Sequence, residues 1–337
     1  MTSLLKNLSK LNNLSILSNL KLLKKQTYKP STYKLYKKKR GQFTMKIGLI
    51  TGANSGLGYA STQKLLKEGY FVYMACRSEE KALKAINSFD PELRDKVEYV
   101  HCDLSSFDSI RECASYIVEK EKQLDVLMLN AGLMATPPKE TKEGYELQMG
   151  VNVLGHALLA DLLLPLVKNT PGARVVTLTS FAGNSGRPLQ KEMFKLNEKY
   201  RPWQAYGNSK LGNLHYAKAL AKYFEEEKID AISVAAHPGG TASELQINTR
   251  NMGGAGLSGP FWVYFMKFFG MTIHQGALSQ LMGALSSEVK NGDYIGPKGS
   301  RTAIKGDPKV IDKNTVSESD IDNFRSLVKA ELGLEHF

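Results

Sequence analysis

The sequence predicts a single α/β domain of Rossmann type, a doubly wound parallel sheet of about seven strands with helices on both faces. Two observations lead to this fold class. From residue 45 onward, short apolar runs alternate with longer amphipathic stretches, and the first apolar run leads into a glycine-rich turn at residues 51–58. Strands that alternate with helices are joined by right-handed crossovers, which build a parallel sheet.

The apolar runs are predicted to be strands because they are short and are followed by glycine or polar residues. They cover residues 45–50, 70–75, 97–101, 125–129, 174–179 and 231–236, with a last short strand near Tyr294. The stretches between them are predicted to be helices, the first of which Gly69 ends. These helices cover residues 58–68, 79–88, 107–120, 151–167 and 205–226.

Positive charge is confined to the start of the chain. The net charge is +12, but residues 1–46 hold 11 Lys, one Arg and no acidic residue, so the rest of the chain balances at 33 basic and 33 acidic residues. A neutral body argues against nucleic-acid binding. We predict a basic N-terminal extension at residues 1–44 and one domain at 45–337. Two interpretations of the extension stay open: an organelle transit peptide of mitochondrial or plastid type, or a disordered tail on a cytoplasmic protein.

The cysteines and histidines give no sign of a metal site. Cys76, Cys102 and Cys113 include no CxxC pair, and the six histidines lack metal-ligand spacing. We therefore expect free thiols and no bound metal.

The turn at residues 51–58 is a candidate dinucleotide-binding loop. Its glycines have GxxxGxG spacing between a predicted strand and a predicted helix. Glycine lets the backbone turn tightly and approach a pyrophosphate, and the helix that follows offers free N–H groups to that anion. The expected cofactor contacts in this turn are Gly52, Asn54, Ser55, Gly56, Leu57 and Gly58.

The end of the second strand indicates which dinucleotide binds. An acidic residue there would bind the ribose hydroxyls of NAD, but this chain has Arg77, whose guanidinium favours the 2′-phosphate of NADP. We therefore expect NADP(H) as the preferred cofactor and NAD(H) as the alternative. The competing interpretation is a solvated Arg77 paired with Glu79 and Glu80.

Residues after the third and fourth strands complete the expected cofactor site. Asp103 is placed to accept from the adenine amino group, although it or Ser105 could instead cap the next helix. The expected contacts here are Asp103, Leu104, Asn130, Ala131 and Gly132.

A tyrosine and a lysine four residues apart form a candidate acid–base pair. On a helix, Tyr206 and Lys210 project from one face. A nearby cation favours the phenolate and lowers the pKa of a tyrosine, which can then act as a general acid or base.

At this point the chain resembles the short-chain dehydrogenase/reductase family, from about residue 45 to Tyr294. The resemblance rests on residues 51–58, Asn130-Ala131-Gly132, Asn152, Ser180, Tyr206-xxx-Lys210 and His237-Pro238-Gly239. Residues 75–77, 151–156 and 236–241 look like the retinol dehydrogenase and protochlorophyllide reductase branch. Two features depart from that pattern: Asn54 and Ser55 stand where some NADP-using relatives have a basic residue, and Val153 where many retinol dehydrogenases have His.

The resemblance implies a role for each catalytic residue. Tyr206 would exchange a proton with the substrate oxygen, and Lys210 would lower the Tyr206 pKa and bind the nicotinamide ribose. Ser180, rather than Thr179, would hydrogen-bond the substrate oxygen. Asn152 would hold a water in the proton relay.

The resemblance also extends the cofactor site beyond the sixth strand. Thr241, together with Pro238 and Gly239, would contact the cofactor near the nicotinamide.

A lid-like insertion is predicted at about residues 242–285. Glycines at 253–260 precede an aromatic run at 261–269. Three interpretations stay open: a lid over an apolar substrate, peripheral contact with a membrane, and packing within the core or a homodimer.

The sequence thus predicts an NADP(H)-dependent oxidoreductase acting on a carbonyl or alcohol of an apolar or aromatic small molecule. Two alternatives are reduction of a carbon–carbon double bond and a non-catalytic dinucleotide-binding module. The latter should have lost a catalytic residue, and Asn152, Ser180, Tyr206 and Lys210 are all present.

Overall fold

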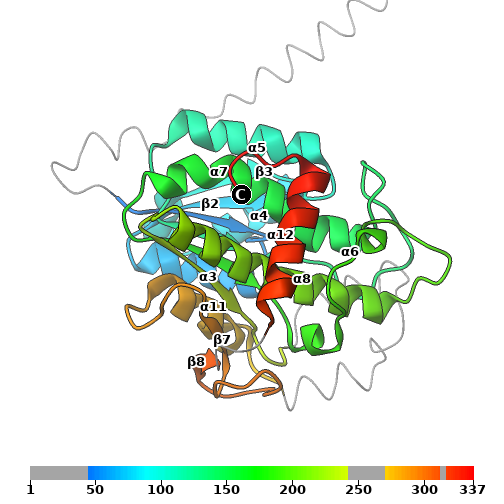
Figure 1. Cartoon of the computed structure of the whole chain (residues 1–337). Coiled ribbons are helices and arrows are strands. Elements are labelled where there is room, and N and C mark those ends of the chain that lie inside the picture. Colours follow the sequence, from blue (N-terminus) through cyan, green and yellow to red (C-terminus); the bar gives the residue numbers. More distant parts are fainter. Residues whose placement is uncertain (1–44, 242–269, 312–315) are drawn as a thin grey trace, which may run out of the picture. The chain divides into compact units, whose positions relative to one another are not determined.

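One sheet organises the fold. The computed structural model describes residues 45–241, 270–311 and 316–337, and the element labels are those of Figure 1. Within these residues, eight strands lie in the order β3-β2-β1-β4-β5-β6-β7-β8. They are β1 (Ile47–Thr51), β2 (Phe71–Cys76), β3 (Val97–His101), β4 (Val126–Leu129), β5 (Ala173–Leu178), β6 (Ala231–Ala236), β7 (Tyr294–Pro297) and β8 (Pro308–Ile311).

The predicted doubly wound parallel sheet is confirmed. Neighbouring strands from β3 to β7 pair in parallel. The eighth strand, β8, was not predicted, and it pairs antiparallel with β7 at the sheet edge. Its Pro308-Lys309-Val310 segment is largely exposed, so it lacks the apolar run that marks the buried strands.

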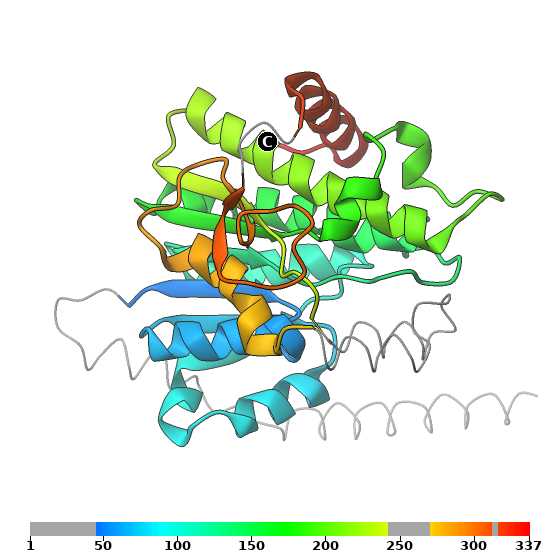
Figure 2. The same ribbon diagram turned by 90° about the horizontal axis from the view of Figure 1, so that it is seen from below.

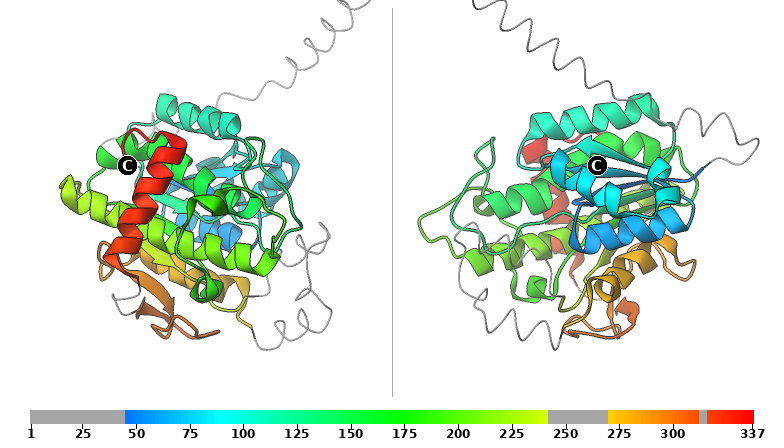
Figure 3. Two further views of the ribbon diagram at one scale, coloured as in Figure 1. Left: turned by 45° about the vertical axis from the view of Figure 1, so that its right-hand side comes forward. Right: turned by 180° about the vertical axis from the view of Figure 1, so that it is seen from behind.

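Helices cover both faces of the sheet. One layer holds α3 (Gly56–Lys67), α4 (Glu79–Ser88) and α11 (Ile273–Leu285), with α3 and α11 side by side in Figure 2. The other holds α5 (Phe107–Lys120), α7 (Gly155–Lys168) and α8 (Pro202–Glu226). Helix α12 (Glu318–Leu332) packs across α8, as Figure 3 shows. Apolar side chains between the layers form the core, and the three cysteines are free and buried.

The strand order creates a crevice at the carboxyl ends of β1 and β4. The chain runs outward from β1 to β2 and β3, then returns to place β4 on the other side of β1. Adjacent crossovers leave in opposite directions there, so the loops separate and leave room for a ligand. The fold therefore brings the glycine-rich turn beside Asn130-Ala131-Gly132.

The first part of the segment predicted as one helix at residues 151–167 is not a regular α-helix in the structure. A short helix α6 (Leu147–Met149) runs into a π-helical turn (Gly150–Leu154) before α7 begins. Two glycines permit this path: a Cβ on Gly150 would lie 2.3 Å from Thr141 Cγ2, and a Cβ on Gly155 would lie 2.6 Å from the Leu104 carbonyl oxygen. Asn152 lies inside the π-helical turn, a deviation that often occurs at functional sites.

The last part of the predicted insertion belongs to the core. Residues 273–285 form α11, whose buried side contacts α3 and the sheet, so the lid prediction was wrong for this part. Its alternating small and apolar residues are buried because the helix covers β5 and β6. Residues 242–269, including the aromatic run, lie outside the described residues, as does the extension at residues 1–44.

One described helical segment, Leu147–Lys168, is long and apolar enough to cross a membrane. However, 89% of its apolar window is buried inside the protein. A core helix of a globular domain has the same property.

Candidate active site

The glycine-rich turn is fixed to β4 by a small hydrogen-bond network. The Thr51 hydroxyl accepts from the backbone N–H groups of Asn130 (2.9 Å) and Ala131 (3.0 Å). The Asn130 side-chain amide donates to the Thr51 carbonyl (2.9 Å), and its oxygen accepts from Gln280 of α11 (3.2 Å). Asn130 therefore acts as a brace for the turn.

Glycine is required at two places in this turn. Gly52 has a φ of +64°, which side-chain-bearing residues rarely adopt. A Cβ on Gly58 would lie 2.3 Å from the Gly52 carbonyl oxygen, so no larger residue fits. Ser55 occupies the N-cap of α3 but makes no capping hydrogen bond with its side chain. The first N–H groups of α3 can thus face an anion.

A cavity of about 360 Å³ lies at this crevice. It brings together most of the residues predicted to contact the cofactor. These are Gly52, Asn54, Ser55, Gly56, Leu57, Arg77, Asp103, Leu104, Asn130, Ala131 and Gly132. Gly58 packs beneath the turn instead of lining the cavity.

Arg77 lies on the cavity wall with a second cation that sequence reasoning missed. Helix α4 begins directly after Ser78, so Lys81 lies one turn beyond Arg77 and also lines the cavity. None of the ion pairs among the described residues joins Arg77 to Glu79 or Glu80. The arrangement leaves two exposed cations beside the end of β2.

Asp103 is held in a local turn. Its Oδ1 accepts from the backbone N–H (3.0 Å) and the hydroxyl (2.7 Å) of Ser105. The N-cap of α5 is Ser106, whose hydroxyl accepts from Ser109, so the suggested capping role for Asp103 or Ser105 was wrong.

Tyr206 and Ser180 meet at the carboxyl end of β5. Tyr206 is only 7% exposed, and burial raises the pKa of its phenol while a hydrogen bond from the Ser180 side chain lowers it. The neighbouring Thr179 hydroxyl donates to the Lys210 carbonyl (2.5 Å), so it is directed into the core. Of the two candidate hydroxyls, Ser180 is the one beside the phenol.

Lys210 lies on the same face of α8 as Tyr206. Its Nζ donates to the Leu178 carbonyl (3.0 Å) and is 6.0 Å from the centroid of the Tyr206 ring. Burial lowers the pKa of Lys210 to about 8. The expected lowering of the Tyr206 pKa by Lys210 is not found, because burial dominates and the opposing effect comes from Ser180.

Asn152 connects the π-helical turn to the catalytic helix. Its Oδ1 accepts from the Leu133 N–H (2.7 Å), and its Nδ2 donates to the Leu133 carbonyl (2.9 Å) and the Ser209 hydroxyl (2.9 Å). The Ser209 hydroxyl in turn donates to the Tyr206 carbonyl (2.8 Å). Asn152 is thereby tied to the helix that carries the phenol.

Gly132 lies between the cavity and two of the candidate catalytic residues, Asn152 and Lys210. A Cβ on Gly132, which lines the cavity, would lie 3.3 Å from both Asn152 Oδ1 and Lys210 Nζ. The cofactor cavity and the acid–base residues are therefore adjacent.

Pro238, Gly239 and Thr241 do not line this cavity. Gly239 has a φ of +69° and packs against Met271 and the Ile304 carbonyl. Thr241 bridges to Met271 and contacts the position of Gly276 in α11. These residues lie after β6, where they join that strand to α11.

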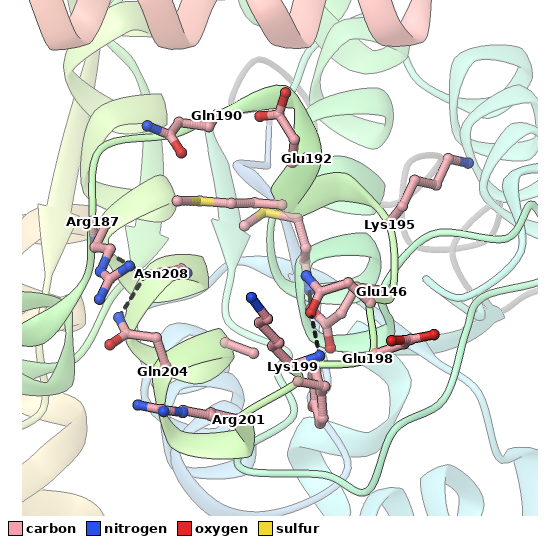
Figure 4. A pocket seen from close by; sticks show the side chains of 15 residues that line it. Glu146, Arg187, Gln190, Glu192, Lys195, Glu198, Lys199, Arg201, Gln204 and Asn208 are labelled. Atoms are coloured by element: carbon pink, nitrogen blue, oxygen red, sulfur yellow. Dashed lines mark hydrogen bonds between the residues drawn. The ribbon is translucent and has the colours of Figure 1, made fainter.

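A second cavity, of about 680 Å³, lies beside the start of α8 (Figure 4). Arg187, Gln204 and Asn208 gather on one side of it, with Gln190 and Glu192 at the start of the 3₁₀-helix Lys191–Phe194. Its labelled side chains are polar or charged, and Met149 and Met193 also line it.

Comparison with known proteins identifies the family. The family model described as short chain dehydrogenase matches residues 46–253, more than half of the chain.

The chain belongs to the short-chain dehydrogenase family. It is an NAD(P)-dependent oxidoreductase, and its Rossmann-type fold matches that assignment.

Retinol dehydrogenases are among the relatives of this short-chain dehydrogenase. It is 37% identical over 257 residues to retinol dehydrogenase 12 of Mus musculus, covering 75% of this chain and 78% of the relative. It is 34% identical over 262 residues to retinol dehydrogenase 11 of Homo sapiens, covering 75% and 78%. Among solved structures, an uncharacterized protein from Mycobacterium paratuberculosis superposes with a TM-score of 0.69 at 27% identity, covering 89% of this chain and 98% of that one.

Several site residues of this short-chain dehydrogenase were not found from sequence. Lys81 could have been found, because it follows Arg77 by one helical turn at a predicted helix start. Gln280 could not, since it reaches Asn130 across 150 residues of sequence. His156 and Ser209 were equally invisible, because their partners come from other elements.

Proposed function

We propose that this short-chain dehydrogenase uses NADP(H) to interconvert a carbonyl and an alcohol on an apolar small molecule. The observation that carries the proposal is the buried Tyr206 phenol, hydrogen-bonded by Ser180 and one turn before Lys210. When bound, the dinucleotide supplies or accepts the hydride.

In the reductive direction, Tyr206 donates its proton to the carbonyl oxygen. Burial keeps the pKa of the phenol raised, so Tyr206 is protonated at neutral pH and serves as a general acid. Ser180 donates a hydrogen bond to the same oxygen and stabilises its developing charge. Lys210 would bind the nicotinamide ribose, and Asn152 would hold the water through which the Tyr206 phenolate regains a proton.

The residues around the crevice fit a bound dinucleotide. The free N–H groups at the start of α3 and the closely packed Gly58 would receive the pyrophosphate. Gly132, which lies beside Asn152 and Lys210, would leave room for the nicotinamide end. Pro238, Gly239 and Thr241 remain proposed contacts near the nicotinamide.

We assign the NADP(H) preference to Arg77 and Lys81 together. Both line the cavity beside β2, where the 2′-phosphate of NADP would accept charge-assisted hydrogen bonds. Arg77→Asp should shift the ratio of kcat/KM for NADPH over NADH toward NADH, and Lys81→Ala should do so more weakly. Lys84→Ala is the matched control, because Lys84 is exposed on the same helix and does not line the cavity. An unchanged ratio in both test variants would remove these residues from the phosphate site.

An apolar alcohol or aldehyde of the retinoid type is the proposed substrate. The names of the relatives support it, and so does the aromatic composition of residues 261–269. Of the three interpretations of that run, a substrate lid is the one we propose. Liposome flotation and light scattering test the other two, which are membrane contact and homodimer packing.

The central experiment follows NADPH absorbance with the full-length protein. The substrates are all-trans-retinal, aliphatic aldehydes, aromatic ketones and quinones, each with wild type and Tyr206→Phe. Loss of the general acid should lower kcat by roughly a hundredfold or more. Tyr216→Phe is the control, since it removes a buried phenol from the same helix away from the site. Activity that survives in Tyr206→Phe would refute the mechanism.

Identifying the products of the same reactions by mass spectrometry or NMR distinguishes the second enzymatic candidate. An α,β-unsaturated aldehyde gives an allylic alcohol if the carbonyl is reduced and a saturated aldehyde if the double bond is reduced. The retinol dehydrogenase relatives favour the first product.

For the N-terminal extension, we propose organelle targeting. Residues 1–44 are basic, rich in hydroxyl groups and free of acidic residues. A fluorescent reporter fused to these residues should enter an organelle of mitochondrial or plastid type. A diffuse cytosolic signal would reject the proposal.

A further inference from the structure

A buried histidine lies between the cofactor turn and the π-helical turn. His156, in the first turn of α7, is 1% exposed. Its Nε2 is 2.8 Å from the Thr51 hydroxyl at the end of β1, and its Nδ1 is 3.0 Å from the Asn152 carbonyl oxygen. The imidazole therefore joins the Asn152 carbonyl to Thr51, a residue 105 positions before His156 in the sequence.

The surroundings fix which nitrogen carries the proton. Thr51 Oγ already accepts from the N–H groups of Asn130 and Ala131, so its remaining role is to donate. His156 Nε2 at 2.8 Å is a better acceptor than the Met128 carbonyl oxygen at 3.4 Å. Nε2 is then unprotonated, and Nδ1–H donates to the Asn152 carbonyl.

Charge on the imidazole is also disfavoured. Burial lowers the pKa of His156 to about 3, and the Lys210 cation acts in the same direction. The neutral Nδ1–H form is therefore present throughout the neutral pH range. In this form, the Thr51 hydroxyl donates to His156 Nε2, and His156 Nδ1–H donates to the Asn152 carbonyl.

This bridge completes the support of Asn152. The side-chain amide of Asn152 is held by Leu133 and Ser209. The carbonyl lies in a π-helical turn, outside the regular hydrogen bonding of an α-helix. His156 donates a hydrogen bond to that carbonyl, so both the side-chain amide and the backbone carbonyl of Asn152 are held in place.

We propose that His156 is a positioning residue. It ties Asn152 and the π-helical turn to Thr51, and thereby aligns the proton relay with the cofactor turn. The inference rests on the proposed function, in which Asn152 serves the relay. Small displacements of an aligned group can lower the rate about a hundredfold.

The kinetic test compares three full-length variants with NADPH and all-trans-retinal. His156→Leu should lower kcat about tenfold to a hundredfold and leave KM for NADPH within about twofold. His215→Leu is the matched control: His215 is 1% exposed, burial lowers its pKa to about 4, and it packs edge-on against Phe324 of α12. His156→Gln, whose amide can donate to Asn152 and accept from Thr51, should recover part of kcat.

Two measurements do not depend on activity. Long-range ¹H–¹⁵N NMR of histidine-labelled protein should show the Nδ1–H tautomer for His156 at neutral pH. Amide exchange at Leu133, whose N–H donates to Asn152 Oδ1, should accelerate in His156→Leu and not in His215→Leu.

Each outcome decides the inference. A kcat in His156→Leu no lower than in His215→Leu, or an Nε2–H tautomer, would overturn it. If wild type reduces no carbonyl, the proposed function fails, and the tautomer and Leu133 exchange then decide alone. The positioning role is supported if wild type carries an Nδ1–H imidazole and amide exchange at Leu133 accelerates in His156→Leu alone. Equal exchange rates at Leu133 in both variants reject it.

Discussion

Lowering the pH from 7 to 5 should destabilise the folded chain through two buried imidazoles, those of His156 and His215. Burial lowers their pKa values from 6.5 to about 3 and about 4. Below pH 6.5 the unfolded chain therefore binds protons that the folded chain does not. The stability that neutral imidazoles contribute is present above pH 6.5 and is lost as the pH falls toward the folded values.

The magnitude follows from these shifts. At pH 5 the unfolded imidazole is about 1.5 pH units below its pKa, whereas the folded imidazoles remain neutral. Each histidine therefore reduces the free energy of unfolding by about 2 kcal/mol relative to pH 7. Both together give a loss of about 4 kcal/mol, a large fraction of the stability of a typical domain.

Urea denaturation followed by circular dichroism at pH 7 and pH 5 measures the effect. Comparison of wild type with His215→Leu isolates one imidazole, because other groups, such as the buried Glu146 whose pKa is raised, titrate alike in both. The variant should lose about 2 kcal/mol less than wild type between the two pH values. Equal losses would refute the reasoning that His215 is held neutral by burial.

Three further predictions concern the site and the C-terminus. Gly58→Ala should abolish measurable NADPH binding by fluorescence titration, because its Cβ would lie 2.3 Å from the Gly52 carbonyl oxygen; wild-type affinity would contradict this. Alcohol oxidation should accelerate with pH between about 6 and 9 while carbonyl reduction stays flat, since the raised pKa of Tyr206 keeps the phenol protonated; a pH-independent oxidation rate would oppose it. Phe337→Ala should lower the free energy of unfolding by about 3 kcal/mol, because Phe337 is 1% exposed and packs on Tyr216 and Tyr223; a loss under about 1 kcal/mol in urea denaturation would disagree.

Local sequence patterns were sufficient to predict most of the strands of the sheet and several of the helices. The strand at 97–101 and the helices at 79–88 and 107–120 have the predicted bounds, because apolar periodicity and polar caps are local signals. The helix α11 fell within the predicted lid because that prediction rested on the glycines at 253–260 and the aromatic run at 261–269, which precede it in the sequence. It is recognised as a core helix only when α3 and the sheet pack against it.

In the candidate site, too, some features could be predicted from local sequence and others depended on tertiary packing. Tyr206 and Lys210 share a helical face, so their spacing could be read directly from the sequence. Local spacing did not distinguish the adjacent hydroxyls of Thr179 and Ser180, and Ser180 was chosen through the family resemblance. In the structure the Thr179 hydroxyl donates to the Lys210 carbonyl, whereas Ser180 interacts with the phenol. The position of Asn152 depends on the π-helical turn, which needs Gly150 and Gly155 to pack closely on neighbouring segments.

The sequence by itself determined the α/β class, the glycine-rich turn and the pair formed by Tyr206 and Lys210, because periodicity and short spacing depend on local geometry. Only the tertiary structure decided that Lys81 joins Arg77 at the cavity and that burial rather than Lys210 dominates the pKa of Tyr206. It also decided the bridge through His156. Hydrogen bonding and desolvation depend on residues that become neighbours only when distant segments pack together.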